Sequence, residues 1–151
     1  MRFYVIISVL CVFVVSCKSR KYYYIDKGKW VSLEKGMSID GYTREGDSIY
    51  GGYGDSLYLH TSMRALKDVD INSFKVCKNT GYAKDANHVY YPLRIICEDA
   101  LEFGGCYFKD YIMENVSPEE FKYIGKGYAT DGYNLFKDGK EINLRFIRHL
   151  E

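Results

Sequence analysis

Apolar and polar positions alternate in a short block that occurs several times along the chain. Residues 81–91 read Gly, Tyr, Ala, Lys, Asp, Ala, Asn, His, Val, Tyr, Tyr, which places aromatic and β-branched residues on both sides of Asp-Ala-Asn. Residues 41–50 and 127–136 follow the same order of residue types, and residues 106–113 carry a compressed copy. Tyr and Val favour strands, whereas Asp, Asn and Gly favour turns. Each copy therefore predicts two short strands joined by a tight turn.

A second pattern precedes three of the copies. Residues 70–74, 99–103 and 117–121 each begin with a residue that can cap a helix and end four residues later with Phe. In the last segment Ser117 can cap, Pro118 suits the first helical position and Glu120 can close a capping box. We expect about one helical turn in each segment, which tucks the Phe under the next strand.

The predicted fold is mainly β, with antiparallel hairpins from degenerate repeats and short single-turn helices. A two-stranded hairpin is marginally stable alone, so neighbouring copies must pair or stack to bury their aromatic faces. Residues 51–55, which include three glycines, are predicted as a loop or a bulged hairpin.

The strongest copy resembles the motif of the DKNYY family of bacterial envelope proteins, which is named for a Lys-Asp-Lys-Asn-x-Val-Tyr-Tyr core. The residues that match this core are Lys84, Asp85, Asn87, Val89, Tyr90 and Tyr91. The further positions to which we assign a structural role in the repeat are Tyr82, Tyr128, Asp131 and Phe136. The copy at 127–136 departs from the core at Thr130, Tyr133 and Phe136. The resemblance covers residues 40–142 and implies a repeat architecture and an envelope location, but no reaction and no catalytic residues.

The N-terminus resembles the signal of a bacterial lipoprotein. After Arg2, residues 3–15 carry no charged side chain, and Ser16 precedes Cys17. Such a run is short for a membrane span and typical of a signal peptide, and a small residue before Cys resembles the site that lipoprotein signal peptidase cleaves. We predict a lipoprotein signal peptide at residues 1–16, a lipid anchor and tether at 17–29 and a DKNYY-like β-repeat domain at 30–151. An uncleaved membrane anchor and an ordinary signal peptide are the alternatives.

Lipidation of Cys17 predicts attachment to a membrane of the cell envelope, because two or three acyl chains anchor a protein stably. The residue after Cys17 is Lys18 and not the Asp that retains lipoproteins in the inner membrane of enteric bacteria. The outer membrane is therefore favoured in a cell that has one.

Composition narrows the range of partners. The length of 151 residues suits one domain, and removal of residues 1–16 takes away one of 21 basic residues and none of 20 acidic ones. The net charge that remains is near zero, whereas nucleic-acid binding needs a cationic excess or patch, so no nucleic acid is expected as partner. Sixteen Tyr against eight Phe suits thin β structures, because Tyr packs one end of its ring and keeps its hydroxyl in water.

Three cysteines remain after the signal peptide and the lipidated residue: Cys77, Cys97 and Cys106. An exported chain permits disulfides. Pairing of Cys97 with Cys106 and pairing of Cys77 with Cys97 are both compatible with the sequence, as are three reduced thiols. No Cys-x-x-Cys occurs, so we expect no zinc or redox motif.

Acidic side chains recur at one position of the motif, at Glu45, Asp85, Asp110 and Asp131. A glycosidase uses two carboxylates, but recurrence at a turn is what a structural role produces. His60, His88 and His149 are scattered without metal-ligand spacing. We therefore expect no catalytic residue, no metal and no cofactor.

The function that these features favour is a non-enzymatic module of the bacterial envelope, anchored in the membrane through Cys17 and presenting a Tyr-lined surface to a protein partner. A narrower version is an immunity protein that masks a toxin at the membrane. The alternatives are a module that binds cell-wall glycan and a hydrolase of glycan or peptide.

The lipoprotein hypothesis is tested by Cys17→Ala. The substitution removes the sulfur that would carry the diacylglyceryl group, so we expect loss of fatty-acid labelling and a shift from the membrane fraction to precursor or soluble forms. Metabolic labelling with a palmitate analogue, followed by fractionation, measures both. Unchanged lipid labelling of the variant in the membrane fraction would contradict the hypothesis.

Overall fold

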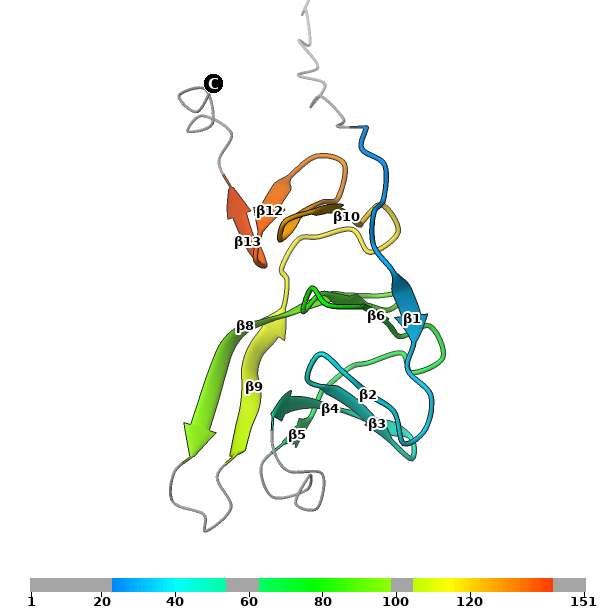
Figure 1. Cartoon of the computed structure of the whole chain (residues 1–151), viewed down its shortest axis with the longest axis vertical. Coiled ribbons are helices and arrows are strands. Elements are labelled where there is room, and N and C mark those ends of the chain that lie inside the picture. Colours follow the sequence, from blue (N-terminus) through cyan, green and yellow to red (C-terminus); the bar gives the residue numbers. More distant parts are fainter. Residues whose placement is uncertain (1–22, 54–62, 99–104, 143–151) are drawn as a thin grey trace, which may run out of the picture.

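The computed structural model describes residues 23–53, 63–98 and 105–142 (Figure 1). These ranges form strands, turns and irregular segments, and they contain no helix with the length and apolar character needed to cross a membrane. The prediction of a mainly β, antiparallel fold is confirmed. The predicted signal peptide and Cys17 lie outside the described residues.

The strands form one nine-stranded and one four-stranded sheet. The strands of the larger sheet are β1 (Trp30–Ser32), β2 (Ser38–Ile39), β3 (Tyr42–Glu45), β4 (Ser48–Tyr53), β5 (Arg64–Ala65), β6 (Lys75–Cys77), β7 (Ala83–Lys84), β8 (Val89–Glu98) and β9 (Gly105–Ile112). The strands of the smaller sheet are β10 (Lys122–Gly125), β11 (Tyr128–Thr130), β12 (Leu135–Lys137) and β13 (Lys140–Ile142). The larger sheet has the order β1-β6-β7-β8-β9-β4-β3-β2, with β5 paired to β4.

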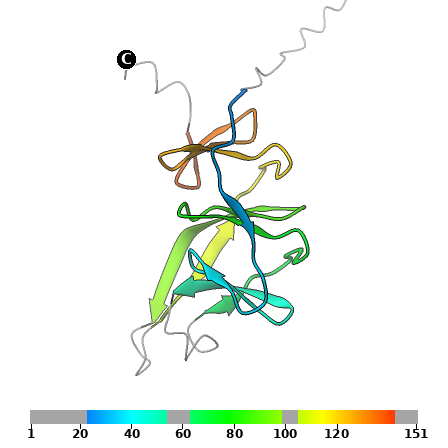
Figure 2. The same cartoon turned by 45° about the vertical axis from the view of Figure 1, so that its right-hand side comes forward.

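Three meanders of three strands each, β2-β3-β4, β6-β7-β8 and β10-β11-β12, lie above one another as three layers (Figure 2). The last two strands pair in the same register in all three layers. The equivalent pairs are Thr43 with Tyr50, Ala83 with Tyr90, and Ala129 with Phe136. The turn between the first two strands ends in each layer on a left-handed glycine: Gly41 (φ 84°), Gly81 (φ 78°) and Gly127 (φ 79°). Glycine adopts this conformation without a steric cost.

Tyrosine hydroxyls connect successive layers. The hydroxyl of Tyr42 in the first layer donates to the carbonyl of Gly81 in the second at 3.0 Å, and the hydroxyl of Tyr82 in the second donates to the carbonyl of Gly127 in the third at 3.0 Å. Both tyrosines have no exposed surface. Burial raises the pKa of both phenols, which keeps them protonated as donors.

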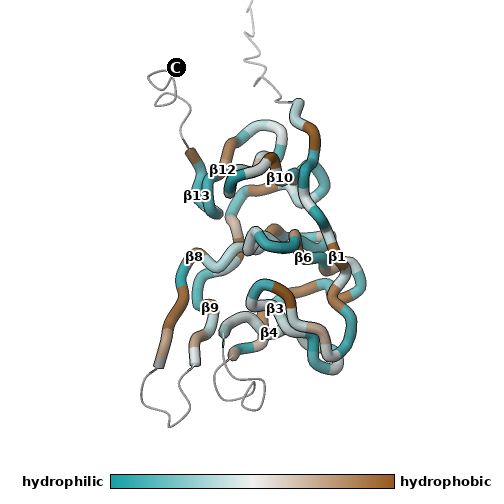
Figure 3. Tube along the Cα trace, viewed as in Figure 1, coloured by the Kyte–Doolittle hydropathy of each residue, from teal (hydrophilic) through white to brown (hydrophobic). Residues whose placement is uncertain are grey.

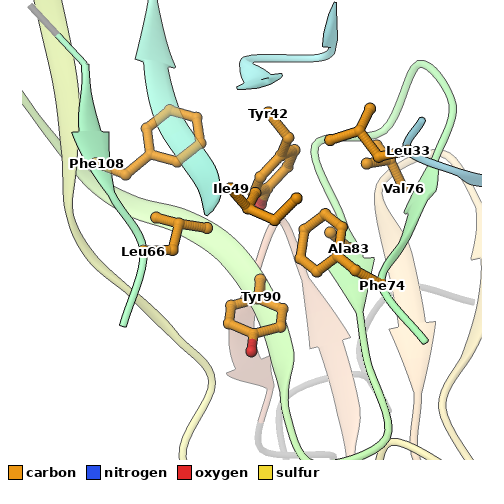
Figure 4. Packing of buried hydrophobic residues seen from close by; sticks show 9 residues of the cluster. All are labelled: Leu33, Tyr42, Ile49, Leu66, Phe74, Val76, Ala83, Tyr90 and Phe108. Carbon is orange, nitrogen blue, oxygen red and sulfur yellow. The ribbon is translucent and has the colours of Figure 1, made fainter. Parts of the chain in front are cut away.

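Phenylalanines fill the spaces between the layers. Phe74 packs against Tyr42 of the layer before it (ring centroids 5.7 Å apart) and against Tyr90 of its own layer (5.5 Å), as Figure 4 shows. Phe121 makes the corresponding contacts one layer later, with Tyr82 at 5.4 Å and with Phe136 at 6.1 Å. Two aromatic cores result, one between each pair of neighbouring layers.

The segments that end on these phenylalanines are turns and not the predicted single-turn helices. In residues 70–74 the carboxylate of Asp70 accepts hydrogen bonds from the Asn72 amide (3.2 Å) and the Ser73 hydroxyl (2.6 Å), which closes a turn through a side chain. In residues 117–121 the Phe121 amide donates to the Pro118 carbonyl at 3.4 Å. A strand starts directly after each Phe, which leaves no room for further helical hydrogen bonds. Residues 99–103 lie outside the described residues.

The compressed copy predicted at residues 106–113 is wrong. Residues 106–112 belong to the single strand β9, which pairs with β8 from Glu98–Gly105 to Tyr90–Ile112. The segment has neither Gly nor Asn at its centre, and its pairing with β8 continues on both sides of the irregularities between Tyr90 and Ile95, so the chain does not turn back. We call the projecting part of β8 and β9, residues 93–98 and 105–108, the arm.

The N-terminal end of the described chain is packed against the third layer. The Lys27 amide donates to the Tyr123 carbonyl at 2.7 Å, and the Tyr123 amide donates to the Asp26 carboxylate at 3.2 Å. Strand β1 then pairs with β6 of the second layer. The structured domain thus extends to Asp26, within the segment predicted as tether.

Tyr82 and Tyr128 occupy the same place in successive layers but have different surroundings. Tyr82 is buried, whereas Tyr128, which has no further layer above it in the described residues, is 36% exposed. We expect Tyr82→Ala to lower the free energy of unfolding by about 3–5 kcal/mol, because it opens a cavity and removes an interlayer hydrogen bond. Tyr128→Ala is the matched control and should cost roughly 1 kcal/mol or less. Urea denaturation measures both, and equal effects would contradict the layered core.

Candidate functional site

Asp85 lies at the centre of the DKNYY-like motif and is 5% exposed. One carboxylate oxygen accepts the Asn87 and His88 amides, each at 2.7 Å. The other accepts the Asp70 amide at 2.8 Å and the Tyr90 hydroxyl at 2.7 Å. Burial alone would raise the pKa of Asp85, but these hydrogen bonds favour the charged form and hold the pKa below its usual range. The carboxylate therefore organises the turn and the contact with residues 70–74.

Asp131 repeats this arrangement in the third layer. Its carboxylate, 3% exposed, accepts the Tyr133 amide at 3.0 Å and the Asn134 amide at 2.7 Å. The other two acids assigned to this motif position lie elsewhere. Glu45 is at the exposed end of β3, beside a turn of two residues, and exposed Asp110 on β9 pairs with Arg94 at 3.8 Å. The two buried aspartates each close their own turn and do not converge on one site.

Lys84 of the motif joins the second layer to the third. Its ammonium donates to the carbonyls of Phe121 (2.9 Å) and Pro118 (3.2 Å), and it lies 4.8 Å from the ring centroid of Trp30. Burial lowers its pKa. The lysine thereby satisfies carbonyls of the turn that positions Phe121.

The remaining motif residues are also placed structurally. Val89 and Tyr90 are fully buried, Tyr91 packs on Tyr82 with ring centroids 4.7 Å apart, and Asn87 is exposed with its amide bound to Asp85. Because Tyr82 and Tyr90 are buried, they do not contribute to the Tyr-lined surface predicted from the sequence.

Cys97 and Cys106 form a disulfide across the arm, where they face each other on β8 and β9. This is one of the pairings that the sequence leaves open. Cys77 is a free, buried thiol whose pKa is raised by burial. In the ranges that the structure describes, no three His, Cys, Asp or Glu side chains are grouped so that they could hold a metal ion.

Exposed apolar side chains gather on the arm and at the end of β4 beside it. Tyr53 (47% exposed) packs on buried Phe108 with ring centroids 5.5 Å apart, and Ile95 (40% exposed) lies opposite Phe108 across the β8–β9 pair. Figure 3 shows the outer part of β8 as a hydrophobic stretch. We call Tyr53 and Ile95, with Phe108 between them and the Cys97–Cys106 disulfide beside them, the distal patch.

The backbone of β8 next to this patch has one open edge. β7 pairs with β8 only at Val89 and Tyr90, and β9 covers the other side of the strand. From residue 94 to residue 98, therefore, no strand within the described ranges pairs with β8 on the side away from β9. Sequence reasoning missed this site. Its one signal is the run from Leu93 to Ile96, which continues the apolar strand beyond the motif.

The site and the fold define an antiparallel β protein whose motif residues connect layers and whose exposed apolar residues and open backbone lie on a projecting arm. In comparison with known families, residues 42–147 match the DKNYY family, and the chain belongs to this family. No curated protein and no solved structure matches the chain.

The pH dependence of stability tests the role of Asp85. Because the pKa of Asp85 is lower in the folded chain than in the unfolded chain, its contribution is present above about pH 4 and is lost as the pH falls through the folded pKa. We expect Asp85→Asn to cost about 1–3 kcal/mol at pH 7, since an amide NH₂ would then face N–H donors. The difference from the wild-type chain should shrink in more acidic solution.

Asp47→Asn is the matched control, because the side chain of Asp47 is 87% exposed. Denaturation at a series of pH values measures the free energy of unfolding of all three chains. A difference between wild type and Asp85→Asn that stays constant from neutral to acidic pH would contradict the proposed hydrogen bonding.

Proposed function

We propose that the protein is a membrane-anchored lipoprotein of the bacterial envelope that binds a protein partner and catalyses no reaction. The anchor is supported by the apolar segment at residues 3–15 followed by Ser16-Cys17. The orientation of the described chain also suits an anchor: its N-terminal end and the outer end of the arm lie at opposite ends of the long axis (Figure 1). An N-terminal anchor would hold the arm away from the membrane.

The single observation that carries the binding proposal is the open edge of β8 beside exposed Ile95 and Tyr53. An extended peptide segment can add to such an edge, because the free amides and carbonyls of the strand give it hydrogen bonds while neighbouring side chains give specificity. Open apolar edges also promote aggregation, and proteins commonly blunt them with Pro or charge. Pro92 and Arg94 limit the edge to a short stretch, which suits a defined partner. A toxin neutralised at the membrane is one partner of this kind.

A hydrolase is the competing class, and the carboxylates argue against it. A groove of about 540 Å³ beside β9 is lined by Asp68, Asp110 and Glu114, together with Lys67 and Lys109. All five of these side chains are exposed, and Asp110 is paired with Arg94. Catalytic acids usually need a buried or apolar setting that separates their pKa values, and these residues have no such setting.

Site-specific photocrosslinking tests the partner surface in the native host. We expect a benzophenone amino acid at position 95 or 53 to capture one protein as a discrete adduct. The same residue at position 133, which is exposed in the third layer, is the matched control and should give no such adduct. We further expect Ile95→Asp to abolish adduct formation from position 53 while unfolding changes little, since position 95 is partly exposed. Adducts of equal yield from position 133, or adducts to glycan alone, would contradict the proposal.

A further inference from the structure

Large apolar side chains are exposed at two places in the part of the chain that the structure describes. Tyr53 and Ile95 belong to the distal patch, next to the arm. The others lie at the opposite end of the molecule, in the N-terminal segment and the third layer (Figure 1), and are between 36% and 86% exposed. They are Tyr23, Tyr24, Ile25, Tyr128 and Tyr133. We call these five residues the apolar end.

Tyr128 lies on the outer face of the third layer. It occupies the position of Tyr42 and Tyr82, whose hydroxyls reach the turn glycine of the next layer. Beyond the third layer, the described residues form no further layer that could cover Tyr128. The side chain that joins one layer to the next is therefore present, half exposed, at the end of the series. This outer face has the composition of an interface.

The N-terminal segment is fixed beside the same layer. The Lys27 amide donates to the Tyr123 carbonyl at 2.7 Å, and the Tyr123 amide donates to the Asp26 carboxylate at 3.2 Å. From this contact the segment runs outward past β10 in both views (Figures 1 and 2). Residues 23–25 therefore lie at the same end of the molecule as Tyr128 and as Tyr133, which is in the turn between β11 and β12.

The charges beside Tyr128 compensate each other. The ammonium of Lys137 lies 4.7 Å from the centroid of the Tyr128 ring, and it pairs with the Asp138 carboxylate at 3.2 Å. It also donates to the Lys126 carbonyl. Burial of apolar surface, and not net charge, is therefore what this end of the molecule offers a partner.

We propose that the apolar end lies in the headgroup region of the lipid bilayer, with its tyrosines at the boundary between water and acyl chains. Tyrosine favours this boundary because its ring is apolar and its hydroxyl stays hydrated. The assignment of a bilayer as the occupant depends on the lipid anchor proposed above. Tyr23 follows Cys17 by six residues, a span of at most about 21 Å, so an anchored chain keeps this end beside the membrane.

Membrane contact at the apolar end would orient the whole molecule. A tether alone lets a domain tumble, whereas a second point of attachment on the third layer fixes the direction of its long axis. The arm lies at the other end of that axis (Figure 1). The distal patch would then face away from the bilayer, where a protein partner can reach it.

Quenching of tryptophan by brominated phosphatidylcholine tests the contact on the full chain in vesicles. Trp30 is the one tryptophan of the chain and gives a background that the wild type measures. In Tyr133→Trp we expect brominated lipid to lower the fluorescence of the new side chain by roughly half, because interfacial rings lie close to the upper acyl chain. Tyr53→Trp, on the distal patch, is the matched control and should be quenched no more than the wild type.

A second set of variants tests whether the aromatic rings themselves make the contact. Tyr23→Ser with Tyr128→Ser, introduced into Tyr133→Trp, should reduce the quenching at position 133. Lys35→Ser with Lys109→Ser, at two exposed positions outside the apolar end, should leave the quenching unchanged. Equal quenching in both double variants would overturn the proposal.

Intact mass and flotation report the anchor separately. A chain with lipid on Cys17 that is quenched equally at positions 133 and 53, or at neither, would overturn the membrane contact and leave the anchor. A chain without this lipid that is quenched by added vesicles at position 133 alone would do the reverse. A blue shift at position 133 that depends on protein concentration and not on lipid would assign the apolar end to a second copy of the chain, and would also overturn the proposal.

Discussion

The hydroxyl of Tyr82 donates a hydrogen bond to the carbonyl of Gly127 and so connects the second layer to the third. Each layer is too thin to bury an aromatic ring by itself, so the ring of one layer must be covered by the next. A buried phenol hydroxyl without a hydrogen-bond partner lowers the stability of the fold by about as much as a lost hydrogen bond. The next layer must therefore place the carbonyl of its turn glycine within hydrogen-bonding distance of that hydroxyl. Tyr42 and Gly81 impose the same condition between the first and second layers. The spacing of the stack therefore follows from a repeated pair of residues, and the phenylalanines Phe74 and Phe121 fill the space that this spacing leaves.

Local patterns were sufficient to predict the hairpins, because turn chemistry and β propensity act over a few residues. The turns at Asp85 and Asp131 and the burial of Phe74 and Phe121 are of this kind. The errors arose where a distant partner decides the outcome. Residues 106–113 have the residue types of a hairpin, but residues 106–112 pair with β8 as part of a single strand. The turn at 70–74 does not become a helix, since Asp70 binds its own turn through its carboxylate.

The candidate site was less predictable than the fold for a related reason. Tyr50, Tyr53 and Tyr90 are similar in sequence terms, and their exposure depends on which element covers them. Tyr90 is covered by Phe74, whereas Tyr53 stays half exposed beside Phe108. The glycine-rich segment at 51–55 was predicted as a loop or a bulged hairpin, and its first part continues β4 and pairs with β9 at Gly52. No short-range rule predicts that pairing, which joins residues more than fifty positions apart.

In the sequence, the arm is inserted between the second layer and the third. It interrupts a series of layers that would otherwise follow one another directly. In the first and third layers the turn-glycine carbonyl also accepts an amide eleven residues later, from Gly52 at 2.9 Å and from Asp138 at 3.0 Å. The same position in the second layer is Pro92, which has no amide hydrogen. Because Pro92 cannot donate this hydrogen bond, the strand can extend outward from the layer. The arm is held to the first layer by buried Phe108 and by the pairing of Cys106 and Tyr107 with β4. Changes in the length and surface of the arm during evolution would therefore leave the three layers almost unchanged, so the same fold can bind different partners.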